Sequence, residues 1–184
     1  TGANTKPVMA DTEEEVQDVY AEVRSQRSEV RLLDNSELYS DFGLPTSDLR
    51  LIDAIKQGLH QSMQQPPNLI LMRQDIAEYG GAFKITEGFV QEFGKERVRN
   101  TPLCESAIVG AALGLSLEGY KSMMEMQFAD FVTVGFNQII NNLAKIHYRW
   151  GQNADVVIRM PTGGGVGAGP FHSQSNEAWF VHTP

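Results

Sequence analysis

Apolar residues recur at helical spacing at the start of the segment that follows Asp48. They fall three or four residues apart, as on one face of an amphipathic helix: Leu51, Ile52, Ile55, Leu59 and Met63. Pro66 and Pro67 then stop the pattern. Residues 69–72 are all apolar, which is typical of a short strand that is covered on both faces.

Helical and extended patterns go on alternating to the end of the chain. The pattern predicts a short helix from about Thr86, a brief strand at 97–99, a helix at 105–117, a strand at 122–126, a helix at 130–149, a strand at 154–160 and a helical stretch from Ser175. Strands that are separated by helices need crossover connections. We therefore predict an α/β fold of three layers, α/β/α, with a mostly parallel sheet.

Ligands in such sheets bind beyond the carboxyl ends of the strands. We therefore expect the functional residues in the segments that follow Met72, Arg99, Met126 and Met160.

The first 47 residues differ from the rest. Residues 12–33 have the pattern of an amphipathic helix, with Thr12 and Glu15 as a capping box, and 34–47 read as a polar linker. We interpret 1–47 as an N-terminal helical connector and 48–184 as one domain. The alternative is that the helix belongs to the same domain.

The composition is that of a globular protein and narrows the classes of function. The 184 residues are 41% hydrophobic and 21% charged, and the net charge is −8. That charge disfavours a nucleic-acid partner, and no apolar run reaches the roughly 20 residues needed to span a bilayer. The one cysteine, Cys104, fits a reducing compartment, so we expect a cytoplasmic protein.

Both ends suggest a piece of a longer polypeptide. The sequence starts without an initiator methionine and stops at Pro184 without a polar tail. We therefore expect the domain at 48–184 to be truncated at its C-terminal end.

The glycine-rich stretch at 162–170 does not fit the known nucleotide motifs. A phosphate-binding loop needs Gly-Lys followed by Ser or Thr, and a dinucleotide fingerprint needs a helix after the glycines and an acid about 20 residues on; here Pro170 and Phe171 follow Gly169. The glycines favour either a backbone that lies close to a ligand or another subunit, or a flexible loop.

Two side chains are candidates for proton chemistry. His172 lies between the glycine-rich stretch and an expected helix start, where an imidazole suits proton transfer near neutral pH; the alternative is a structural or surface histidine. Glu105 stands in the first turn of an apolar helix. From the residues alone, a solvated acid that favours the helix dipole is the commoner case.

The remaining candidates follow the strand at 122–126. Gln127, Phe128, Asp130 and Phe131 either line a site or serve as a helix cap and core aromatics. The four histidines and Cys104 show no metal-ligand spacing, so we predict no metal site in this chain.

Several motifs, taken in order, resemble the beta subunit of thiamine diphosphate-dependent 2-oxo acid dehydrogenases. They are YGGAFK at 79–84, TPLCE at 101–105, EMQFADF at 125–131, NQIIN at 137–141, AK at 144–145, GGGVGAGP at 163–170 and HSQS at 172–175. The resemblance covers about 49–184. It implies a transketolase-like domain that holds the aminopyrimidine ring of thiamine diphosphate.

The resemblance also implies roles for four residues. Glu105 matches the glutamate that bonds the pyrimidine nitrogen N1′, and Phe131 the aromatic residue that packs on that ring. Gln127 matches a position near the substrate pocket. His172 matches the histidine that handles a proton when the acyl group passes to a lipoyl arm.

Part of the expected site is not in this sequence. In the family, a Gly-Asp-Gly motif of the alpha subunit or a fused alpha domain holds the diphosphate and Mg²⁺, and no Gly-Asp-Gly occurs here. The implied partners are that alpha part, a second beta subunit and the lipoyl domain of the acyltransferase component. We expect this chain by itself to be inactive, with Glu105 exposed until a partner covers it.

The implied reaction is oxidative decarboxylation of a 2-oxo acid. The motifs look closer to branched-chain members, although pyruvate members share parts of them. The alternatives are a transketolase-like or 1-deoxyxylulose-phosphate synthase domain, and a non-catalytic nucleotide-binding or assembly module on the same sheet.

Overall fold

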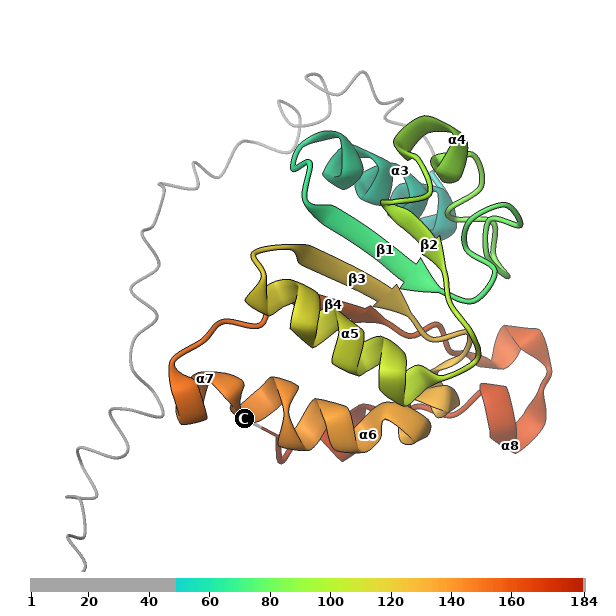
Figure 1. Ribbon diagram of the computed structural model, residues 1–184. Coiled ribbons are helices and arrows are strands. Elements are labelled where there is room, and N and C mark those ends of the chain that lie inside the picture. Colours follow the sequence, from blue (N-terminus) through green and yellow to red (C-terminus); the bar gives the residue numbers. More distant parts are fainter. Residues whose placement is uncertain (1–48, 184) are drawn as a thin grey trace, which may run out of the picture. The chain divides into compact units, whose positions relative to one another are not determined.

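A parallel sheet is the centre of the computed structural model, which describes residues 49–183 (Figure 1). Its strands in those residues are β1 (Leu69–Arg73), β2 (Val98–Asn100), β3 (Lys121–Glu125) and β4 (Val156–Arg159), in the order β2-β1-β3-β4. All three neighbouring pairs are parallel, which confirms the predicted fold class. The predicted helix at 12–33 and linker at 34–47 lie outside the described residues.

Helices cover both faces of this sheet (Figure 1). The α-helices are α3 (Leu51–Gln64), α4 (Phe89–Phe93), α5 (Glu105–Leu117), α6 (Val132–Asn141), α7 (Ile146–Trp150) and α8 (Gly169–His172). The short 3-10 helices are η1 (Ala129–Phe131), η2 (Leu143–Lys145), η3 (Gly164–Val166) and η4 (Glu177–Phe180). The side chains of α3 and α4 share one core cluster, and those of α5 and α6 share the other.

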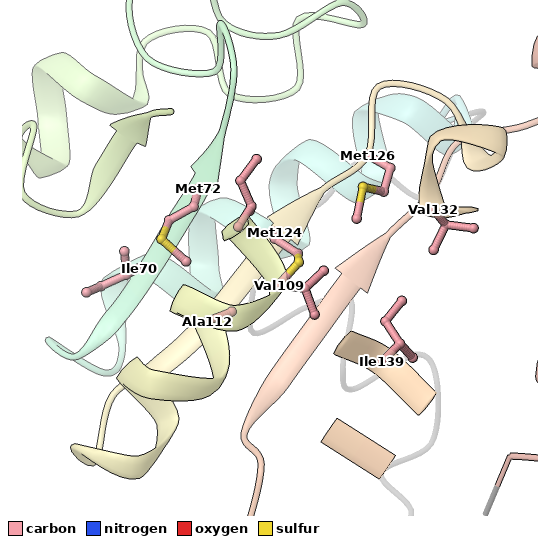
Figure 2. Packing of buried hydrophobic residues seen from close by; sticks show 9 residues of the cluster. Ile70, Met72, Val109, Ala112, Met124, Met126, Val132 and Ile139 are labelled. Carbon is pink, nitrogen blue, oxygen red and sulfur yellow. The ribbon is translucent and has the colours of Figure 1, made fainter. Parts of the chain in front are cut away.

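Alternate residues of the central strands supply the two clusters, because successive side chains of a strand point to opposite faces. Met72 and Met124 point to α5 and α6, where they pack with Val109 and Ile139 (Figure 2). Their strand neighbours point to the other face, which α3 and α4 cover. Leu71 and Met123 pack there with Met63 of α3, Phe89 of α4 and Val98 of the neighbouring strand β2. Strands buried on both faces explain the unbroken apolar run at 69–72.

One predicted element is wrong. The expected single helix at 130–149 is a series of short helices: η1, α6, η2 and α7. Helix α6 ends at Asn141, and its C-terminal cap, Asn142, has φ −114° and ψ −68°, with φ well away from the typical helical value of about −63°. Its side-chain amide donates to Gln138 Oε1. Asparagine is a poor helix former, because its short side chain favours other backbone conformations, so the adjacent pair Asn141-Asn142 weakens the helix at this point.

Smaller differences concern where helices start. The helix expected from Thr86 begins at Phe89, after Gly88 at φ 89°. The stretch expected from Ser175 is the 3-10 helix η4, and a further short helix, α8, covers residues 169–172, which we expected to be loop. His172 is therefore the last residue of a helix rather than a residue between a loop and a helix start.

Strand β4 is the edge of the sheet within residues 49–183. No described helix covers the part of its surface next to α3, where Val157 is 61% exposed. A largely apolar groove runs there between α3 and β4, lined by Ile55, Leu59 and Met123 among others. Its charged lining residues are Lys121, Asp155 and Arg159.

Candidate functional site

The carboxyl edge of the sheet brings together the starts of the segments that we expected to carry function. Helix α5 follows β2, the 3-10 helix η1 follows β3, and the glycine-rich stretch and α8 follow β4. Because the strands are parallel, all of these segments leave the sheet at the same edge. Glu105, Gln127, Phe131 and His172 all stand on them.

Glu105 is the first residue of α5 and is only 9% exposed. The expectation that this acid is exposed in the chain by itself was therefore wrong. Helix α6 packs against the first turns of α5: a Cβ placed on Gly135 would lie 3.5 Å from the carbonyl oxygen of Glu105. Among residues 49–183 no side chain bonds or ion-pairs with the Glu105 carboxylate, which leaves this acceptor available.

Phe131 lies one helical turn before Gly135, just ahead of α6. Residues four apart share a helix face, so Phe131 is near the end of α5 that carries Glu105. Its ring centroid is 5.3 Å from that of His172. Phe128 stacks on the same histidine, with ring centroids 4.3 Å apart and planes 15° from parallel. The structure thus brings His172 and Phe131 together.

Asp130 is the polar partner of His172. The Nδ1 atom of His172 lies 3.0 Å from Oδ1 and 3.2 Å from Oδ2 of Asp130. Sequence reasoning placed Asp130 among residues that line a site, but it did not pair the two, because they are 42 positions apart. The pairing depends on how the loops after β3 and β4 meet.

Gln127 bonds to a residue that the sequence analysis did not single out. Gln74 Nε2 donates to Gln127 Oε1 at 3.1 Å, and Gln74 is buried. Gln74 directly follows β1 and Gln127 comes two residues after β3. This bond fixes the Gln127 side chain at the carboxyl edge and leaves its amide nitrogen for a further acceptor.

A buried ionic cluster lies beneath this edge. Arg73 and Arg159 each donate to a different oxygen of the Glu125 carboxylate, and Arg73 and Glu125 are 1% and 4% exposed. Burial lowers the pKa of Arg73 below the ordinary arginine value, and the Glu125 carboxylate opposes that change. Sequence reasoning missed this cluster. Its signal was a charged residue at the carboxyl end of each of three strands, β1, β3 and β4.

The double-glycine loop closes over this cluster. A Cβ on Gly81 would lie 3.6 Å from Arg73 Nη1 and 3.9 Å from Glu125 Oε1. Gly80, at φ 79°, lies against the backbone of Glu87. The motif at 79–84 thus serves to cover the ionic cluster closely.

The glycine-rich stretch makes no such close approach within the described residues. A Cβ on Gly163, Gly164, Gly165, Gly167 or Gly169 would meet no described atom within 4 Å. Gly163, Gly167 and Gly169 have positive φ angles, a conformation that glycine adopts readily. Among the described residues, the reason for glycine at these three positions is therefore the backbone conformation and not close packing.

The described residues contain neither a metal-binding cluster nor a membrane-spanning helix. No group of three His, Cys, Asp or Glu side chains between 49 and 183 is arranged to hold a metal ion. In that same range, every helix is too short or too polar to cross a membrane.

Comparison with protein families decides the classification. The model of the family "Transketolase, pyrimidine binding domain" matches residues 47–184. The chain belongs to this family. The expected resemblance to a transketolase-like pyrimidine-binding domain is therefore confirmed, and the carboxyl edge just described is the edge of such a domain.

Individual relatives of this pyrimidine-binding domain are dehydrogenase beta subunits. The chain is 42% identical over 137 residues to the pyruvate dehydrogenase E1 component subunit beta of Leifsonia xyli subsp. xyli, which covers 73% of this chain and 41% of the relative. It is 42% identical over 140 residues to the 2-oxoisovalerate dehydrogenase subunit beta of Bacillus subtilis, with 75% and 43% covered.

A plant relative is slightly more distant. The 2-oxoisovalerate dehydrogenase subunit beta 2, mitochondrial, of Arabidopsis thaliana is 40% identical over 157 residues, with 84% of this chain and 43% of the relative covered. The chain thus spans about two fifths of the length of these relatives.

Proposed function

We propose that this chain is the pyrimidine-binding part of the decarboxylating component of a 2-oxo acid dehydrogenase complex. That enzyme oxidatively decarboxylates a branched-chain 2-oxo acid or pyruvate and passes the acyl group to a lipoyl domain. Membership of the pyrimidine-binding family and about 40% identity to beta subunits of such enzymes support this proposal. The single observation that carries it is Glu105, a residue only 9% exposed at the sheet's carboxyl edge, whose carboxylate has no partner among residues 49–183.

The residues fit the pyrimidine half of thiamine diphosphate. Glu105, a residue only 9% exposed, has a carboxylate with no bond from residues 49–183. It can accept a hydrogen bond from a ring nitrogen that carries a proton. Phe131 offers an aromatic surface near the same end of α5. When bound, the cofactor supplies a carbon nucleophile and an electron sink for the decarboxylation of the 2-oxo acid.

Each proposed residue then has one task. Glu105 holds a proton at the pyrimidine nitrogen N1′, which a glutamine cannot exchange. Phe131 orients the ring by packing. Gln127, fixed by Gln74, presents its amide nitrogen to the substrate. His172 moves a proton at its Nε2 atom during transfer to the lipoyl arm.

The diphosphate and Mg²⁺ do not fit the described residues. No metal-binding cluster occurs in 49–183, and the 184-residue sequence has no Gly-Asp-Gly motif. We therefore assign that half of the site to an alpha subunit or a fused alpha domain, and we include a second beta subunit in the assembly. The exposed free thiol of Cys104 agrees with a reducing compartment such as the cytoplasm.

Two classes of substrate remain, pyruvate and the branched-chain 2-oxo acids. The pyruvate and 2-oxoisovalerate relatives named above are equally identical to this chain, at 42%. A panel of 2-oxo acids on the complete enzyme separates them. An enzyme that uses aldehyde acceptors instead of lipoyl domains would support the alternative of a transketolase-like or 1-deoxyxylulose-phosphate synthase function.

Replacement of Glu105 tests the proposal directly. In the complete enzyme, Glu105→Gln keeps the size and one acceptor of the side chain but removes its acid–base function. We expect kcat to fall by roughly 10²–10⁴-fold, the usual contribution of a positioned acid or base. Near-normal turnover would leave Glu105 without a catalytic role and favour the non-catalytic assembly module.

The matched control is Glu118→Gln. Glu118 is the C-terminal cap of the same helix α5 and is exposed, so its replacement should leave kcat within about twofold of the parent enzyme. Equal melting temperatures of the two variants would show that any loss of activity in Glu105→Gln is not a loss of folding.

A further inference from the structure

His172 and Asp130 form a close pair at the carboxyl edge of the sheet. They come from two different loops, η1 after β3 and α8 after β4. The Nδ1 atom of the imidazole faces both carboxylate oxygens, at 3.0 and 3.2 Å. The side chains are 33% and 16% exposed, so the pair is partly shielded but open to the surface on one side.

Aromatic rings set the plane of the imidazole. Phe128 stacks nearly parallel on it at 4.3 Å, and Phe131 lies at 5.3 Å with its plane tilted by 44°. A ring held in this plane with Nδ1 against Asp130 has little freedom to flip. Nε2, at the opposite edge of the imidazole, is then the nitrogen that can meet a reacting group.

The chemistry of the carboxylate decides which nitrogen carries the proton. An ionised carboxylate can only accept a hydrogen bond, so Nδ1 must be the donor, and the hydrogen bond at one ring nitrogen sets the state of the other. We propose that Asp130 is a positioning residue: it holds neutral His172 in the Nδ1–H tautomer, with the lone pair of Nε2 turned toward the site.

The use of this arrangement rests on the proposed function. In the proposed transfer to a lipoyl arm, Nε2 takes up one proton from the reacting group that gives up the acyl chain, and the ring becomes an imidazolium with a proton on each nitrogen. The Asp130 carboxylate then faces that positive charge at hydrogen-bond distance. Nε2 returns the same proton in the reverse step, and Asp130 itself is not protonated.

The tautomer can be measured without any activity. Long-range ¹H–¹⁵N correlation spectra of the full 184-residue chain distinguish the two ring nitrogens of each histidine at about pH 8.5, where an ordinary imidazole is neutral. We expect His172 to show a protonated Nδ1 and a bare Nε2. His182, which is exposed, serves as the internal reference and should show the opposite preference of a free imidazole.

Asp130→Ala should return His172 to the pattern of His182. An unchanged dispersion of the backbone amide signals would show that the variant is folded. A native His172 with its proton on Nε2, or an Nδ1–H tautomer that survives Asp130→Ala, would overturn the proposal. The first result needs no variant, so it does not depend on how Asp130→Ala folds.

A double-mutant cycle in the complete enzyme tests the same link through the reaction. Asp130→Ala should lower kcat for acylation of the lipoyl domain by roughly 10–100-fold, the usual effect of losing the residue that orients a histidine, with KM for the 2-oxo acid unchanged. In the His172→Ala background, Asp130→Ala should have no further effect. A full additional loss in that background would contradict a role through His172.

Asp155→Ala is the control. Asp155 is an exposed acid just before β4, at the opposite edge of the sheet. Its variant should keep both the tautomer and the acylation rate. If Glu105→Gln keeps normal turnover, the proposed function fails while the tautomer result still decides the role of Asp130.

Discussion

Gly135 of α6 lies against Val109 of α5 so closely that a Cβ on the glycine would come within 3.0 Å of the valine Cγ2 atom. The same Cβ would lie 3.5 Å from the carbonyl oxygen of Glu105. The close approach of α6 therefore buries the first turn of α5. Because that turn carries Glu105, the burial of the proposed catalytic acid depends on a residue 30 positions away.

Gly135→Ala should weaken the packing of the two helices. The added methyl group has to displace the buried Val109 side chain, and overpacking of this kind typically costs about 1–3 kcal/mol. We expect the free energy of unfolding, measured by urea titration of the full chain, to fall by that amount.

Gly114→Ala is the matched control. Gly114 lies in α5, and a Cβ there would meet no described atom within 4 Å. Alanine in a helix interior is more favourable than glycine by about 0.5–1 kcal/mol, so this variant should be slightly more stable than the parent. A destabilised Gly114→Ala with an unaffected Gly135→Ala would contradict the described helix contact.

Glu125→Gln should be strongly destabilising. The amide keeps the shape of the side chain but removes the carboxylate that ion-pairs with both Arg73 and Arg159. An uncompensated charge in the interior costs about 3–5 kcal/mol. Thermal unfolding followed by circular dichroism measures the loss.

The control for this prediction is a contact between a histidine and a carboxylate at the surface. His60 Nε2 lies 2.7 Å from Glu92, whose side chain is 47% exposed. Exposed pairs contribute at most about 1 kcal/mol, so Glu92→Gln should unfold within a few degrees of the parent. Similar losses of thermal stability in Glu125→Gln and Glu92→Gln would show that the contribution of the ionic cluster to stability does not depend on its burial.

The fold was predictable where a signal is local. The helix at 105–117 was predicted with its observed bounds because Pro102 precedes it and an unbroken apolar run fills it. The break at Asn142 was missed because asparagine costs an isolated helix only modestly.

The arrangement of the candidate site was predictable only in part, because its contacts are long-range. Glu105, Gln127, Phe131 and His172 were expected at the carboxyl edge from their positions after strands and from the family motifs. They lie in segments that leave the sheet there, and their roles stay predictions. The Asp130–His172 pair and the cluster of Arg73, Glu125 and Arg159 were not found. Both depend on which strands are neighbours and in what register, and the spacing along the chain does not encode that order.

Gly80→Ala should cost more than Gly88→Ala, although both glycines have positive φ angles, 79° and 89°. The conformation itself costs a residue other than glycine about 1–2 kcal/mol. At Gly80 a Cβ would also lie 2.7 Å from the Cα of Glu87, while at Gly88 it meets nothing within 4 Å.

The difference between the unfolding free energies of these two variants measures the contribution of close packing, because both share the cost of a positive φ angle. We expect Gly88→Ala to lose about 1–2 kcal/mol and Gly80→Ala to lose at least about 1 kcal/mol more. Equal losses would mean that the loop over the ionic cluster has room to move away from Glu87.

The chain by itself should bind thiamine diphosphate weakly. On the proposed function it holds the residues for the pyrimidine ring, while the diphosphate and Mg²⁺ are held elsewhere. Isothermal titration calorimetry of the 184-residue chain with Mg²⁺ and the cofactor should therefore give no heat of binding in the micromolar range. Micromolar affinity would contradict the division of the site between two chains or domains.

The outer side of β4 has a practical consequence for work with this chain. Within residues 49–183 no strand pairs with that side, and Val157 stands exposed beside it. Unpaired backbone groups on an apolar edge attract further strands. Preparations of the 184-residue chain should therefore self-associate as the protein concentration rises, and a lysine at position 157 should delay the onset of turbidity.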